Sequence, residues 1–170
     1  LFQAGTSAFQ LPNIFTEQFF QWYAQMGGTG ATLALVILFM TSKSQYLKQL
    51  GKLSFLPGIF NINEPMIFGA PIVMNPLLAV PFMLVPVVNT IIVYIFTVLN
   101  IIPKMMVKPP FTVPAPLGAL ITTNWNWMAC VLVFVCFFVS LAIYYPFFKL
   151  FEKRTLENEK AQIAEEAAKQ

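Results

Sequence analysis

The chain has 170 residues, of which 58% are hydrophobic and only 10% charged, and its mean hydropathy is +0.70. Soluble domains usually carry about 25% charged residues, so this chain has too little polar surface to cover a globule in water. The segments 65–103 and 109–148 contain no charged residue, and each exceeds the roughly twenty residues of one helical crossing. We therefore expect an all-α, polytopic membrane protein rather than a soluble domain.

Residues 13–26 predict a helix at the membrane surface. Apolar and aromatic residues recur there at helical spacing, and the Thr16 hydroxyl can cap the first turn. Trp and Tyr favour the boundary between water and lipid, so this helix is expected to be interfacial or partly inserted. The sequence GGTG at 27–30 leads into a transmembrane helix expected near 29–42.

A lysine-bearing loop at 42–52 precedes two apolar arms that are each too short to cross a membrane. Pro57 and Gly58 are expected to break the first arm. Irregular backbone at membrane depth is tolerated where protein buries it or where it lines a water-filled cavity. We therefore predict a re-entrant hairpin over about 53–76, with Glu64 at its tip.

Two further transmembrane helices are expected near 77–102 and 125–148, the first kinked by two prolines. The intervening stretch is too rich in proline for a standard helix and could dip partway into the membrane. Residues 151–170 carry many charges and predict a solvated helical tail. Lysines of the 42–52 loop and basic residues of the tail place both on the cytoplasmic side by the positive-inside rule, although Lys104 and Lys108 count against this.

Glu64 is the acidic residue expected at membrane depth, where a charge costs at least roughly 2.5–3.5 kcal/mol. Asn61 and Asn63 are nearby partners for its carboxylate, and Asn75 could reach it across the hairpin. Such a group suits a polyhydroxylated substrate and could act as a base toward a substrate hydroxyl. The alternative is a protonated Glu64 that only pins the hairpin tip through backbone hydrogen bonds.

Other chemistry finds little support. The chain has no histidine, and both cysteines, Cys130 and Cys136, lie within an expected span. No metal ion and no cofactor are therefore expected. The GGTG segment lacks the lysine of a phosphate-binding loop, so it serves either substrate lining or close helix packing. The net charge of +3 arises from lysines that flank membrane segments, so no nucleic acid partner is expected.

Three stretches, however, resemble the enzyme IIC component of bacterial sugar phosphotransferase systems, in particular its lactose/cellobiose/diacetylchitobiose branch. They are GGTGATL at 27–33, LGKLSFLPGIFNINEPMIFGAPIVMNP at 50–76 and FTVP at 111–114. Members of this family are usually more than twice as long as this chain. The resemblance implies that residues 1–150 are the carboxyl-terminal portion of a transport domain, and that 151–170 form a cytoplasmic tail.

The resemblance also implies a function: a multi-pass sugar permease in the bacterial inner membrane, usually a homodimer when full length. It would bind a β-linked disaccharide such as cellobiose, diacetylchitobiose or lactose, which the phosphocysteine of a IIB partner phosphorylates. The family's substrate glutamate maps onto Glu64 and its neighbour onto Asn63, with Gly28 and Thr29 as lining residues. From the residues alone, an ion- or proton-coupled secondary transporter and a non-transporting membrane scaffold remain alternatives.

Overall fold

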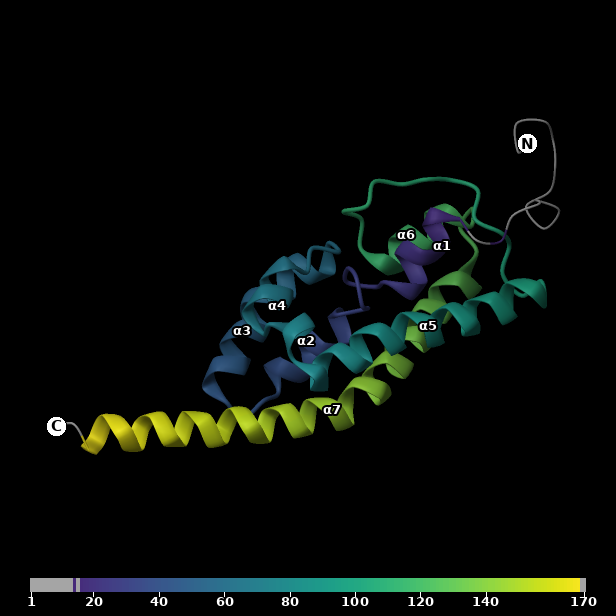
Figure 1. The fold of residues 1–170 in the computed structure, drawn as a ribbon. Coiled ribbons are helices and arrows are strands. Elements are labelled where there is room, and N and C mark those ends of the chain that lie inside the picture. The colour runs from purple at the N-terminus through teal and green to yellow at the C-terminus, as the bar shows by residue number, and fades with distance from the viewer. Residues whose placement is uncertain (1–13, 15, 169–170) are drawn as a thin grey trace.

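The computed structural model describes residue 14 and residues 16–168, with side chains placed as far as residue 164. Within these residues every regular element is a helix (Figure 1), so the all-α prediction is confirmed. The start of the helix predicted over 13–26 lies outside the described residues. So do the beginning of the 1–150 portion and the end of the 151–170 tail.

The first helix is shorter than predicted and changes type after one turn. Helix α1, Glu17–Phe19, is followed by the π-helix η3, Phe20–Ala24. Thr16 caps α1 as predicted, because its hydroxyl accepts a hydrogen bond of 3.4 Å from the backbone N–H three residues later. Trp22 and Tyr23 are fully buried in the protein. These aromatic rings therefore pack inside the chain, rather than at the water–lipid boundary that the sequence suggested.

The helix expected near 29–42 is present only as α2, Leu33–Met40. Its eight residues extend about 12 Å, less than half the thickness of a bilayer's hydrocarbon core. Five of the eight side chains are buried, so α2 is a central packed helix. The backbone before it is turned, and three glycines there, Gly27, Gly28 and Gly30, have positive φ angles.

Helices α3, Gln45–Ile59, and α4, Glu64–Gly69, form the two arms of the hairpin. Most of the predicted 42–52 loop is in fact the first half of α3. This helix continues past Pro57, and the chain reverses instead at Asn61, whose φ of 62° lies in the left-handed region. The Tyr46 hydroxyl donates to the Gly69 carbonyl and joins the far ends of the arms. The hairpin is therefore present, with its first arm starting earlier than predicted.

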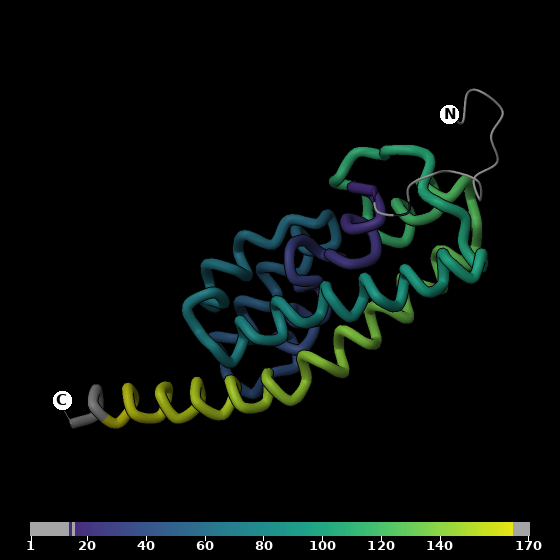
Figure 2. Tube along the Cα trace, turned by 45° about the vertical axis from the view of Figure 1, so that its right-hand side comes forward, coloured from purple at the N-terminus to yellow at the C-terminus, as the bar shows by residue number. Residues whose placement is uncertain are grey.

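Two long apolar helices, α5 (Pro76–Val98) and α7 (Trp127–Ala168), lie side by side (Figures 1 and 2). They match the spans predicted near 77–102 and 125–148. In the most apolar 18-residue stretch of each helix, only 28% (α5) and 33% (α7) is buried inside the protein. Most of that apolar surface is thus exposed, which suits contact with lipid better than the core of a soluble domain.

The remaining elements connect these helices. The short 3-10 helix η4, Ile72–Met74, links the hairpin to α5. Residues 103–110 have no regular structure, and the connection after α5 arches over α1 and α6, Ala115–Thr122 (Figure 1). Helix α7 continues unbroken into the predicted tail, with Pro146 inside it, and bends part-way along its length.

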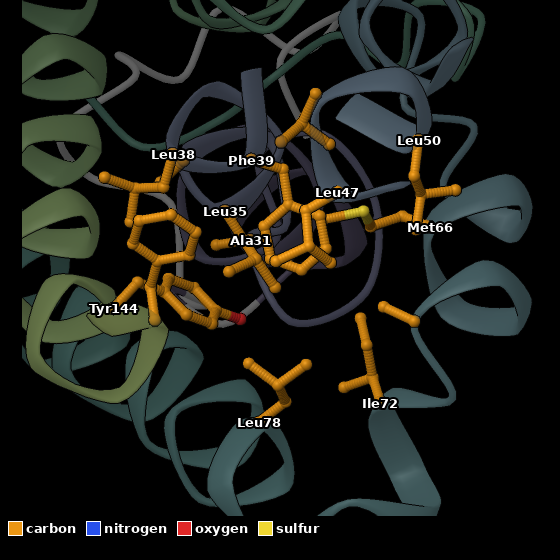
Figure 3. Close-up of a cluster of buried hydrophobic side chains, with 14 of the residues drawn as sticks. Ala31, Leu35, Leu38, Phe39, Leu47, Leu50, Met66, Ile72, Leu78 and Tyr144 are labelled. Atoms are coloured by element: carbon orange, nitrogen blue, oxygen red, sulfur yellow. The ribbon is translucent and has the colours of Figure 1, made fainter. Parts of the chain in front are cut away.

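Two clusters of buried side chains hold these elements together. One surrounds α2, where Tyr144 of α7 packs with Leu35, Leu47 and Met66 (Figure 3). The Tyr144 hydroxyl also donates a hydrogen bond of 2.6 Å to the Gly30 carbonyl. The other cluster is built around residues of η3, α6 and α7. Together they fix the glycine-rich turn and the hairpin relative to the long helices, and so position the pocket described next.

Candidate functional site

A pocket of about 440 Å³ lies where the first helix, the glycine-rich turn and the hairpin tip meet. All four residues singled out from the sequence, Gly28, Thr29, Asn63 and Glu64, line it. They come from segments more than thirty residues apart in sequence, and the fold brings them to one cavity. The other lining residues are Glu17, Phe20, Gln21, Gln25, Asn61 and Phe111.

Asn61 holds the hairpin tip in place through both ends of its side-chain amide. Its oxygen accepts a hydrogen bond of 3.1 Å from the backbone N–H of Gly27. Its nitrogen donates to the carbonyls of Phe111 and Val113, at 2.8 and 3.1 Å. Sequence reasoning offered Asn61 as a partner for the Glu64 carboxylate. In the structure it ties the tip to the glycine-rich turn and to the FTVP segment instead.

Asn63 connects the tip to the same turn at a second point. Its amide nitrogen donates a hydrogen bond of 2.8 Å to the Thr29 carbonyl, and the residue is buried. Gly28 lies directly against this amide: a Cβ added at Gly28 would be 2.5 Å from Asn63 Cγ. Such a distance leaves no room for any side chain, so the close approach requires glycine at this position.

Glu64 is the first residue of α4, and its side chain is exposed toward the pocket. It makes no hydrogen bond or ion pair with any residue that the structure describes. The expected partner Asn75 instead caps α5, accepting a hydrogen bond of 3.1 Å from the Leu77 N–H. The carboxylate is therefore free to accept hydrogen bonds from a ligand, and the reading in which it only pins the hairpin tip finds no support in these contacts.

Sequence reasoning missed the contribution of the first helix to this pocket. Glu17, Gln21 and Gln25 follow one another at intervals of four residues and all line the cavity. The Glu17 carboxylate forms an ion pair with Lys108, which belongs to the connection arching over this helix. The four-residue spacing of polar side chains was the available signal, but the same spacing occurs on any solvated helix face.

The comparison with protein families decides what kind of protein this is. The model of the family "Phosphotransferase system, EIIC" matches residues 1–86, just over half of the chain. The chain belongs to this family. The resemblance noted in the sequence is thereby confirmed, and the pocket is that of an EIIC protein.

Curated EIIC relatives extend the similarity along nearly the whole chain. The lichenan permease IIC component of Bacillus subtilis (strain 168) is 43% identical over 160 residues, which cover 93% of this chain and 35% of the relative. The cellobiose-specific EIIC component of Geobacillus stearothermophilus is 44% identical over 163 residues, covering 95% of this chain and 36% of the relative. The chain thus spans about a third of the length of these relatives.

A solved EIIC structure has the same fold. The transporter ChbC, the IIC component of the N,N'-diacetylchitobiose-specific phosphotransferase system, superposes with a TM-score of 0.88 at 42% sequence identity. The match covers 94% of this chain and 37% of ChbC. Because the chain is an EIIC member with two long, outwardly apolar helices, it is part of a membrane protein.

Proposed function

We propose that this chain carries the sugar-binding pocket of a phosphoenolpyruvate-dependent phosphotransferase permease. The permease would bind a β-linked disaccharide such as cellobiose, diacetylchitobiose or lactose, and present it to the phosphocysteine of a IIB partner. The observation that carries this proposal is the convergence of Glu64, Asn63, Gly28 and Thr29 on one cavity. The relatives named for lichenan, cellobiose and lactose support the substrate class.

The pocket suits a sugar in size and in polarity. A cavity of about 440 Å³ falls within the range of pockets that bind small molecules. Glu64 supplies an unpartnered carboxylate that can accept hydrogen bonds from two hydroxyl groups. As a sugar hydroxyl attacks phosphorus, its proton must leave, and in this proposal the Glu64 carboxylate accepts it. The phosphoryl group itself stays on the IIB cysteine until the attack.

We further propose how the permease lies in the membrane and with which proteins it assembles. The permease would cross the bacterial inner membrane several times as a homodimer, with the hairpin re-entrant and residues 151–170 forming the cytoplasmic tail. The lysines of α3 and the basic residues that follow the α7 span support this orientation through the positive-inside rule. Fusion of IIC with IIB in the lactose-specific EIICB relatives supports a IIB partner. EIIC membership favours this function over a proton-coupled transporter or a scaffold.

Replacing Glu64 by glutamine tests the proposal in the full-length permease. Uptake of radiolabelled cellobiose, lactose and diacetylchitobiose is measured in membrane vesicles supplied with phosphoenolpyruvate, the IIB partner and the carrier proteins that pass the phosphoryl group from phosphoenolpyruvate to IIB. We expect Glu64→Gln to lower uptake by about a hundredfold, the lower end of the usual contribution of general-base catalysis, with unchanged membrane insertion. Glu157→Gln, on the exposed tail, should transport like the wild type. Wild-type uptake by Glu64→Gln, or uptake driven by a pH gradient without phosphoenolpyruvate, would overturn the proposal.

A further inference from the structure

Two glutamine side chains, Gln21 and Gln25, form part of the pocket wall next to the first helix. We infer that Gln21 and Gln25 bind sugar hydroxyl groups directly and determine which disaccharides the pocket accepts. This inference rests on the proposed function, but it concerns residues outside the GGTG and NEP segments that carry the family resemblance. It follows from how η3 presents these two side chains, and from what their amide groups do in the structure.

The π-helix explains how both glutamines reach the pocket. The Gln25 N–H donates to the Phe20 carbonyl five residues earlier, at 2.8 Å. This wider turn fully buries Trp22 and Tyr23, while Gln21 and Gln25 stay half-buried at the cavity. Single π-helical turns are rare and occur frequently at functional sites. Here the turn separates an aromatic face in the core from an amide face in the pocket.

The two amides are available to a ligand. Neither Gln21 nor Gln25 makes a side-chain hydrogen bond with any residue that the structure describes. Three other polar side chains at the pocket differ in this respect: Asn61 and Asn63 donate to backbone carbonyls, and Glu17 is paired with Lys108. All hydrogen-bond donors and acceptors of the two side-chain amides are therefore available to a ligand. A ligand that covered these amides without hydrogen-bonding to them would bind more weakly, because the amides would lose their water partners.

The glutamines also supply what Glu64 lacks. An ionised carboxylate only accepts hydrogen bonds, whereas each glutamine offers two N–H donors and one carbonyl acceptor. Sugar hydroxyls both donate and accept, so a pocket with a free carboxylate and two free amides matches them better than a carboxylate alone. A site built to hydrogen-bond a hydroxyl strongly rejects an analogue that lacks it. These amides are therefore suited to distinguish one disaccharide from another.

The test measures sugar binding rather than transport, using purified full-length permease and isothermal titration calorimetry. Cellobiose, lactose and diacetylchitobiose are titrated into the wild type and into Gln21→Ala, Gln25→Ala and Gln21→Glu. Each alanine variant should bind the preferred sugar roughly threefold to tenfold more weakly, as expected for one lost hydrogen bond. Gln21→Glu keeps the side-chain length but removes the donors, so it should weaken binding similarly. Gln18→Ala is the matched control, because Gln18 lies half-buried on α1, directly before η3, and outside the pocket lining.

Monodeoxy analogues of the preferred sugar separate direct contact from an indirect effect. For the analogue that lacks the contacted hydroxyl, the wild type and the alanine variant should bind with equal affinity. If no analogue in the series removes the difference, the glutamines act on the fold and the inference is wrong. If both alanine variants bind every sugar like the wild type while Glu64→Gln weakens binding, the inference fails and the proposed function stands. If the wild type binds none of the three disaccharides, both fail.

Discussion

Gly28 has a φ of +97°, and a side chain there would overlap the Asn63 amide at the hairpin tip. Two independent constraints thus act on one residue, since L-amino acids avoid this backbone region and the space is already filled. The consequence reaches Glu64, because Asn63 is its neighbour in sequence and fixes the tip to the Thr29 carbonyl. Glycine at this position is a requirement of the pocket rather than of the core.

Gly28→Ala should therefore reduce sugar binding by at least about fivefold, since forcing the positive φ alone costs roughly 1–2 kcal/mol. The measurement is the dissociation constant for the preferred disaccharide, with helix content followed by circular dichroism. Gly58→Ala serves as control, because a Cβ at Gly58 meets only Leu33 Cδ1, at an ordinary 3.5 Å. Equal sugar affinities of the two variants would contradict this account of Gly28.

Among single residues, only Glu64 stood out in the sequence by its type, whereas Asn63, Gly28 and Thr29 were singled out through the resemblance to the EIIC family. A lone carboxylate between apolar arms has few explanations. Gln21 and Gln25 could not be predicted, since glutamines four apart fit any exposed helix face. Their role depends on a π-turn, which leaves no distinct pattern in a sequence.

At the level of elements, the base of the hairpin is fastened to α7 by a buried carboxylate. Glu152 is 5% exposed, and its Oε1 accepts hydrogen bonds of 2.7 Å from both the Ser42 hydroxyl and the Lys43 N–H. Its Oε2 forms an ion pair with Lys149 at 2.9 Å. Burial alone would raise the pKa of Glu152, but these hydrogen bonds and the lysine lower it overall. The carboxylate is thus held ionised where α2 turns into α3.

Glu152→Gln should destabilise the protein by about 2 kcal/mol, because an amide cannot accept all of these charge-assisted hydrogen bonds. Thermal unfolding in detergent at neutral pH measures the loss. Glu157→Gln is the matched control, since Glu157 is exposed on the same helix. A Glu152→Gln variant as stable as this control would show that the contact does not hold the two elements together.

Acidity provides a second test of the same contact. Since folding lowers the pKa of Glu152 below its ordinary value of 4.5, the carboxylate's contribution is complete above that pH. It is lost as the pH falls through the lower pKa of the folded state. The stability difference between the wild type and Glu152→Gln should therefore shrink below pH 4.5, and a difference that stays constant on acidification would argue against an ionised Glu152.

At the scale of the whole molecule, the meaning of an exposed apolar side chain depends on whether lipid or water surrounds it. The outer faces of α5 and α7 expose many large apolar side chains, among them Phe138 at 65%. The tail of α7 also exposes an apolar residue, Ile163, at 66%. The same exposed fraction therefore predicts contact with lipid at Phe138, which lies within the predicted span, and contact with water at Ile163, which lies beyond it.

Phe138→Lys should impair insertion, because a lysine at the centre of a span costs about 2.5–3.5 kcal/mol on insertion scales. Ile163→Lys should have no effect, although the two side chains are equally exposed. The fraction of permease that resists carbonate extraction from membranes measures insertion. Equal fractions for the two variants would contradict the placement of this part of α7 in lipid.

The same constraint explains which parts of the architecture the sequence could predict. Long uncharged stretches identify α5 and α7 because a bilayer imposes a minimum length. The apolar run before the first lysines suggested a span, yet it forms the short buried helix α2. Hydrophobicity cannot distinguish lipid from protein as the surroundings of a helix. The sequence likewise did not show that the span and the charged tail form one continuous helix, α7. The composition changes from apolar to charged where the tail begins, but the helix continues through that point.

The three hydrogen bonds of Asn61 also bear on the order in which the protein is made. They join residues that are 34, 50 and 52 positions apart, so none forms between close neighbours in sequence. A ribosome delivers Asn61 long before it delivers Phe111 and Val113. Contacts over such separations form slowly, because the intervening chain must first be ordered. The bonds to Phe111 and Val113, and with them the part of the pocket wall that Phe111 forms, can therefore be made only after the segment following α5 has been synthesised.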